Sequence, residues 1–147
     1  MTIDDAAAMQ ALGARLAAIV RAGDVILLDG PLGAGKTTLA RGLLQALGLQ
    51  GEAPSPSFAI VQPYEPPEVA LPVRHVDLYR VERPGEIEEL GLEDGAEDAL
   101  TIVEWPSRAG QAAWPDALRL TLTIAPSGAR RLTAMVPEGW RARWSSI

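Results

Sequence analysis

The sequence contains no cysteine, and it has a single lysine and a single histidine among 147 residues. Without cysteine, disulfide bonds and thiolate metal sites are excluded. No apolar run approaches the ~18 residues that a membrane-spanning helix requires. The first five residues include two acids, whereas a secretion signal begins with positive charge. We therefore expect a cytoplasmic protein that does not contact a membrane.

The length and the hydrophobic content of 48% predict one globular domain over residues 1–147. The net charge of -6 is unevenly divided along the chain. Residues 1–105 carry 7 basic and 17 acidic side chains, whereas residues 106–147 carry 6 basic and 2 acidic ones. Such a division is typical of a docking surface and also of charge scattered over a solvated surface, and both interpretations remain open.

The first third of the chain shows the pattern helix, strand, glycine-rich loop, helix. We expect Thr2 to cap a first helix, which ends before Gly23. The run DVILLDG, residues 24–30, predicts a strand that is buried on both faces. Leucines at helical spacing over residues 39–47 predict a second helix, which Gly48 ends.

The loop GPLGAGKTT, residues 30–38, matches the phosphate-loop pattern G-x-x-x-x-G-K-[ST] and holds the only lysine, Lys36. Glycines let successive N–H groups point at phosphate oxygens, and the helix that begins at Lys36 adds the positive end of its dipole. The compact ammonium of lysine reaches the β and γ phosphates, a space that the planar fork of arginine fits poorly. Thr37 offers a hydroxyl to magnesium. The loop therefore predicts a nucleoside triphosphate site.

The remainder of the chain alternates short strands with acidic segments. Strands are expected at residues 57–64, 73–80, 99–105, 118–125 and 130–136. Two short acidic helices are expected within residues 83–99, and a short helix or strand at 140–144. The last two strands alternate apolar with polar residues and predict an antiparallel hairpin. The predicted fold is α/β, a P-loop NTPase-like mixed sheet with a parallel core, antiparallel strands added at the C-terminal end, and helices packed on the sheet.

Two acids end apolar strands: Asp77 in VRHVDLYR and Glu104 in LTIVEW. A carboxylate at the end of a buried strand is the usual arrangement for holding magnesium in a phosphate-loop enzyme. Glu104 follows the more apolar run, so we assign it to magnesium and Asp77 to positioning the attacking water. The reverse assignment, and a structural role for one of the two, remain open. The neighbouring His75 is expected to be structural.

Three classes of protein fit a phosphate loop of this kind: an ATPase, a small-molecule or nucleotide kinase, and a non-enzymatic, nucleotide-responsive binding subunit. A GTPase is disfavoured because no second lysine exists for an N/T-K-x-D guanine motif. A kinase usually carries an arginine-rich lid and an acceptor-binding insert. Between Gly48 and Asp98 the chain has three arginines and one short Pro-rich stretch, which leaves little room for an acceptor pocket.

Several motifs occur together in one order: GPLGAGKTTLARGLLQALG, then SPSF, HVDLYR, LG and EWP. In this order they resemble the TsaE (YjeE) family, the ATPases of bacterial tRNA N6-threonylcarbamoyladenosine synthesis, and the resemblance covers about residues 10–106. It implies a Mg2+-dependent ATPase that acts with TsaB and TsaD, the proteins that modify adenosine 37 of tRNA. It implies that tRNA is met through that complex.

The resemblance also implies roles for particular residues. Lys36, Asp77 and Glu104 would be catalytic, and Thr37 with Glu104 would hold Mg2+. The segment Ser55, Pro56, Ser57 and Phe58 would be a nucleotide-sensing switch. The residues implied to bind ATP are Leu32, Gly33, Ala34, Gly35, Lys36, Thr37 and Thr38. Two positions depart from the family pattern, because Pro31 replaces an acid and Ser57 replaces a threonine.

Overall fold

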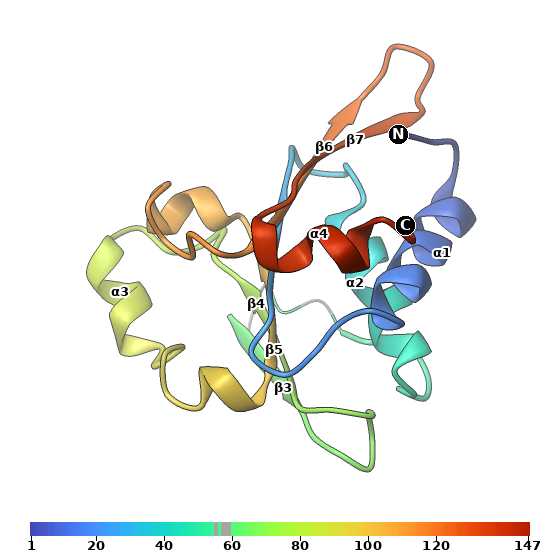
Figure 1. Ribbon diagram of the computed structural model, residues 1–147. Coiled ribbons are helices and arrows are strands. Elements are labelled where there is room, and N and C mark those ends of the chain that lie inside the picture. Colours follow the sequence, from blue (N-terminus) through green and yellow to red (C-terminus); the bar gives the residue numbers. More distant parts are fainter. Residues whose placement is uncertain (55, 57–59) are drawn as a thin grey trace.

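A computed structural model describes residues 1–54, 56 and 60–147 as one seven-stranded sheet with helices on both faces (Figure 1). The strands are β1 (Thr2–Ile3), β2 (Val25–Asp29), β3 (Val61–Tyr64), β4 (Val73–Asp77), β5 (Leu100–Glu104), β6 (Leu118–Ile124) and β7 (Arg130–Met135). The α-helices are α1 (Ala6–Ala17), α2 (Lys36–Ala46), α3 (Pro84–Glu89) and α4 (Glu138–Trp144). Two 3-10 helices span Ala96–Asp98 and Pro106–Ala109. Within the described residues, no helix has both the length and the apolar character needed to cross a bilayer.

The strand order is β1-β7-β6-β2-β5-β4-β3. The centre is parallel, because β2 pairs in parallel with both β5 and β6, and β4 pairs in parallel with β5. The edges are antiparallel: β3 against β4, β7 against β6, and β1 against β7. The predicted mixed α/β fold is confirmed, and so is the hairpin of the last two strands. Its first strand, β6, also belongs to the parallel core.

The start of the chain differs from the prediction. Thr2 does not cap a helix; it lies in β1 and pairs with Arg131 of β7. The cap of α1 is Asp5, whose Oδ1 accepts a hydrogen bond from the Ala8 N–H at 2.8 Å. A capping side chain within reach of N3 stabilises the first turn wherever it occurs. Thr2 pairs with a residue 129 positions further along the chain, and the residues next to Thr2 in the sequence do not indicate this pairing.

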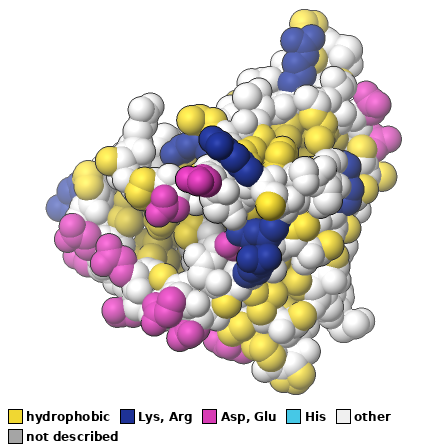
Figure 2. All heavy atoms as spheres, viewed as in Figure 1, with side chains coloured by type: hydrophobic (Ala, Val, Ile, Leu, Met, Phe, Trp, Pro, Cys, Tyr) yellow, Lys and Arg dark blue, Asp and Glu magenta, His cyan; other side chains and the backbone are white. Residues whose placement is uncertain are grey.

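The strand β2 is buried on both faces, as its apolar run predicts. Ile26 and Leu28 point into the larger core, which α1 and α2 cover. Leu27 points to the opposite face, where it packs with Val76 and Val103 under the segments around α3 and residues 105–117. Acidic side chains gather over α3 and the segment that follows it (Figure 2). This acidic run fits a solvated face, and a docking surface is the alternative interpretation.

The helices α1 and α2 cross with their backbones in direct contact. A Cβ added at Gly13 would lie 2.3 Å from the Leu39 carbonyl oxygen, and one added at Gly42 would lie 2.4 Å from the Gln10 carbonyl oxygen. Atoms cannot approach so closely without a shift of the backbone. Each helix therefore contributes a glycine at the point where the other helix passes, and this crossing fixes α2 and the loop before it.

We expect Gly42→Ala to lower the free energy of unfolding by about 1–3 kcal/mol, because the methyl group would overpack a backbone contact. The matched control is Gly139→Ala in α4, where an added Cβ would meet no atom within 4 Å. In a helix this control change is neutral or stabilising by up to about 1 kcal/mol. Chemical denaturation of both variants measures the difference. Equal stability of the two variants would contradict the crossing described above.

Candidate phosphate-loop site

The glycine-rich loop joins the carboxyl end of β2 to the N-terminus of α2. Gly35 is the N-cap residue of α2 and has a φ of 107°, a conformation that strongly favours glycine. Because glycine has no side chain to cap the helix, the first N–H groups of α2 face the loop. The Met9 side chain of α1 packs against this residue, since a Cβ added at Gly35 would lie 2.7 Å from Met9 Cε. The loop is thus supported from beneath by α1.

Two carboxylates lie side by side at the same edge of the sheet. Asp77 ends β4 and Glu104 ends β5, and they are register partners in the parallel pair. Both side chains are buried, with 5% of Asp77 and 2% of Glu104 exposed. Parallel strands bring their carboxyl ends to one edge, so these two acids meet the loop that follows β2.

Glu104 is held by two neighbours. The Thr37 hydroxyl of α2 donates to Glu104 Oε1 at 2.9 Å, and His75 Nε2 lies 2.7 Å from Glu104 Oε2. His75 is fully buried on β4, one strand away. Each carboxylate oxygen therefore has one partner, and the orientation of the Glu104 side chain is fixed before any ligand arrives.

Lys36 lies at the centre of the site. Its ammonium donates to the carbonyl oxygens of Gly30 and Pro31 at 2.6 and 2.9 Å, and lies 4.2 Å from the centre of the Trp105 ring. Burial lowers the pKa of Lys36, and the nearby carboxylates of Glu104, Asp77 and Asp29 oppose that shift. The lysine is thus a desolvated cation whose present partners are neutral carbonyls and an aromatic face. Negative charge brought into the site would stabilise its charged form.

These side chains surround a single pocket of about 230 Å³. Its lining residues are Leu32, Gly33, Ala34, Gly35, Lys36, Thr37, Thr38, Asp77, Tyr79, Glu104 and Trp105. The structure therefore brings together every loop residue assigned to phosphate binding and both predicted acids. Of the predicted switch segment, Pro56 is described, and its carbonyl oxygen accepts from the Ile60 N–H at 2.7 Å. Ser55, Ser57 and Phe58 lie outside the described residues.

Tyr79 is a lining residue that the sequence reasoning missed. Its backbone N–H donates to Asp77 Oδ1 at 2.8 Å, and its ring packs against Trp105 with the ring centres 4.9 Å apart. Trp105 follows Glu104 directly and has a φ of 59°, an unusual conformation for a bulky residue. Both aromatic residues follow the ends of the carboxylate-bearing strands. The sequence already marks Trp105 by this position, as a ring near the nucleotide or a partner or as packing at the strand end, and the same signal could have indicated Tyr79.

The donor set of this pocket suits magnesium. Mg2+ prefers hard oxygen ligands and is commonly bound by one or two protein oxygens, with phosphate and water completing its shell. Here the Thr37 hydroxyl and the Glu104 carboxylate lie in contact, and Asp77 is the neighbouring carboxylate. Across residues 1–54, 56 and 60–147, no group of three or more His, Cys, Asp and Glu side chains could hold a metal by itself. The site therefore fits an ion that arrives with a phosphate ligand.

The fold and the site define a class: a mixed α/β protein with a phosphate-loop motif and two carboxylates at the carboxyl edge of a parallel sheet. The chain belongs to the TsaE family, because the profile of "Threonylcarbamoyl adenosine biosynthesis protein TsaE" matches residues 3–132. The resemblance seen in the sequence motifs is confirmed by this match.

Named relatives agree with this assignment. The chain is 38% identical to the tRNA threonylcarbamoyladenosine biosynthesis protein TsaE of Streptomyces coelicolor over 140 residues, which cover 94% of this chain and 95% of that one. It is 34% identical to the Bacillus subtilis protein of the same name over 125 residues, or 84% and 77% of the two chains. The crystal structure of Bacillus subtilis YdiB superposes with a TM-score of 0.81 at 26% identity, covering 99% of this chain and 90% of that chain.

Proposed function

We propose that this protein is a Mg2+-dependent ATPase of tRNA threonylcarbamoyladenosine biosynthesis, and that it acts in the cytoplasm with TsaB and TsaD proteins. One observation carries the proposal. Four side chains from three elements line the same pocket as the phosphate loop: Lys36, Thr37, Asp77 and Glu104. The names of the relatives supply the pathway. tRNA would then be met through the complex.

Each residue has a chemical task in this proposal. The loop N–H groups and Lys36 would hold the phosphates, with the lysine exchanging its bonds to Gly30 and Pro31 for phosphate oxygens. Thr37 and Glu104 would hold Mg2+, which when bound neutralises charge on the β and γ phosphates. Asp77, whose Oδ1 accepts from the Tyr79 N–H, would orient the water that attacks the γ phosphorus. The products are ADP and inorganic phosphate.

The kinase alternative needs room for a phosphate acceptor next to ATP. The described residues that line the pocket include three charged side chains, Lys36, Asp77 and Glu104, and each of them already has a task toward ATP, Mg2+ or water. This described lining thus offers no further charged group to hold a second substrate. This supports hydrolysis over transfer to a second substrate, and it favours use of the energy of ATP on a partner protein.

The test combines an enzyme assay with tRNA analysis. We expect slow release of phosphate from Mg-ATP by the protein alone, and ATP-dependent assembly with a TsaB–TsaD pair. Cells depleted of the protein should lose threonylcarbamoyladenosine from their tRNA, measured by mass spectrometry of nucleosides, and the intact gene should restore it. Unchanged levels after depletion would refute the proposal. Phosphate found on a small acceptor without any partner present would establish the kinase instead.

A further inference from the structure

Arg130 reaches the glycine-rich loop from 97 positions further along the chain. Its Nη2 donates to the Gly33 carbonyl oxygen at 2.9 Å, and its Nη1 donates to the Gly128 carbonyl oxygen in its own hairpin. The guanidinium therefore bridges the β6–β7 hairpin and the loop. Gly33 is one of the pocket-lining residues, so this contact adjoins the site.

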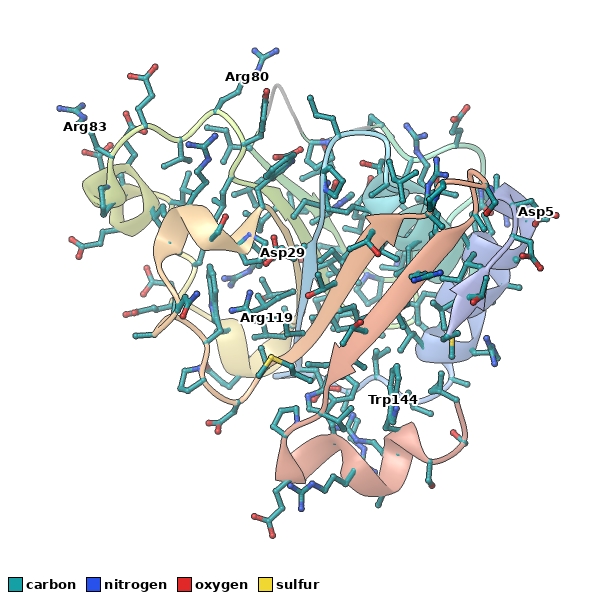
Figure 3. All side chains as sticks on the ribbon, turned by 90° about the horizontal axis from the view of Figure 1, so that it is seen from above. Asp5, Asp29, Arg80, Arg83, Arg119 and Trp144 are labelled. Atoms are coloured by element: carbon teal, nitrogen blue, oxygen red, sulfur yellow. The ribbon has the colours of Figure 1, made fainter. Side chains whose placement is uncertain are left out.

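The backbone of Arg130 is fixed on both sides. The residue opens β7 and lies between two strands, opposite Ile124 of β6 and Ile3 of β1. The hairpin also touches the loop at its beginning, because a Cβ added at Gly30 would lie 2.6 Å from the Leu122 carbonyl oxygen. The hairpin and the N-terminal end of α1, marked by Asp5, lie on the same side of the molecule (Figure 3). Arg130 is therefore presented to the loop by a packed element.

Among the described residues, the pocket lining has one cation available to phosphate, Lys36, beside the carboxylates of the site, so a second cation near it would stabilise a bound polyphosphate. Asp29 is paired with Arg119, 3.1 Å away, and the two point toward one another from β2 and β6 (Figure 3). Lys36 shares the pocket with two buried carboxylates, Asp77 and Glu104. A polyphosphate would add further negative charge, which a neighbouring guanidinium offsets.

The contact also acts through a peptide group. The Gly33 carbonyl belongs to the same amide as the Ala34 N–H, and Ala34 lines the pocket. A charged donor on the carbonyl holds the plane of that amide and polarises it, which strengthens the hydrogen bond from its N–H to the Pro31 carbonyl oxygen, 3.2 Å away; the same oxygen accepts from Lys36. A neutral side chain at position 130 would supply neither effect to the same degree.

We propose that Arg130 is a positioning residue of the ATP site, which holds the Gly33–Ala34 peptide of the loop and adds positive charge beside the phosphates. This inference rests on the proposed function, because ATP is the ligand proposed there. By this inference the β6–β7 hairpin contributes a residue to the ATP site, although it lies outside the phosphate-loop motif and both carboxylate-bearing strands.

The test compares Arg130→Ala and Arg130→Lys with Arg131→Ala in the full chain. Arg131 is the next residue on β7, is exposed, and carries the same charge, so its removal is a matched control. We expect Arg130→Ala to raise the Kd and the KM for Mg-ATP about tenfold, with kcat changed less than about threefold. Arg130→Lys should recover part of the affinity, and Arg131→Ala should bind ATP within about twofold of the wild type.

Folding and binding are separated by melting temperatures measured with and without Mg-ATP, since a ligand that binds the native state raises the melting temperature. The ATP-induced rise should be reduced in Arg130→Ala and normal in Arg131→Ala. An equal rise in both variants, or normal affinity in Arg130→Ala, would overturn the inference while the ATPase proposal stands. A wild-type chain that binds no ATP would overturn the proposed function and this inference with it.

Discussion

Lys36→Ala is expected to reduce ATP hydrolysis at least about a hundredfold and to leave the chain folded. The ammonium is the cation at the centre of the pocket, and its contacts are loop carbonyls and one aromatic ring. Its loss opens no apolar core, and it removes a buried charge whose desolvation is costly. Phosphate release measured at saturating Mg-ATP, together with circular dichroism, checks both parts of this prediction.

Lys36→Arg should also be severely impaired, although it keeps the charge. The side chain lies over the Trp105 ring in a pocket of about 230 Å³, and a planar guanidinium needs more width than an ammonium there. Arg131→Ala, which removes an exposed cation outside the pocket, should retain wild-type turnover. An arginine variant at position 36 with nearly normal turnover would refute the geometric argument.

Separate defects are expected from the two carboxylates. Glu104→Ala removes the partner of the Thr37 hydroxyl, and should weaken Mg-dependent ATP binding by about tenfold or more. Asp77→Ala should lower kcat by about a hundredfold while the KM for ATP changes little, because the proposed task of Asp77 concerns the attacking water.

The measurement is a titration of Mg2+ and ATP for each variant, with single-turnover rates at saturation. Glu104→Gln serves as a conservative companion, since it keeps the shape of the side chain and loses its charge. Reversed phenotypes would show that Asp77 holds the metal and Glu104 orients water. Normal binding and turnover in both alanine variants would contradict the ATPase proposal itself.

The parts of the site that follow one another in sequence could be predicted. A buried strand, six loop residues and the start of α2 are encoded within residues 24–38, so their arrangement follows from local pattern. Asp77 and Glu104 could be predicted as well, because each ends an apolar run and parallel strands share a carboxyl edge. Their side-by-side register confirms that both strands deliver to the same edge.

The features that the sequence did not predict depend on contacts between distant residues. Thr2 is a residue type that often caps helices, but strand pairing with Arg131 places it in the sheet, and Asp5 caps the helix. The alternation in β6 predicts a strand with one wet face, but it does not reveal that β2 is its parallel neighbour. Arg130 resembles any surface arginine until the hairpin places it at Gly33. Local sequence carries no signal for any of these.

The glycine contacts between α1 and α2 bear on how the protein could pass a signal to a partner. Since the two helices touch backbone to backbone at Gly13 and Gly42, neither can slide past the other without breaking that fit. The phosphate loop, as the direct extension of α2, belongs to the same stationary block. A movement that reports the presence of the γ phosphate would therefore have to be carried by residues outside α1, the phosphate loop and α2. In mechanical terms, these three segments form the fixed frame against which such a movement would be made.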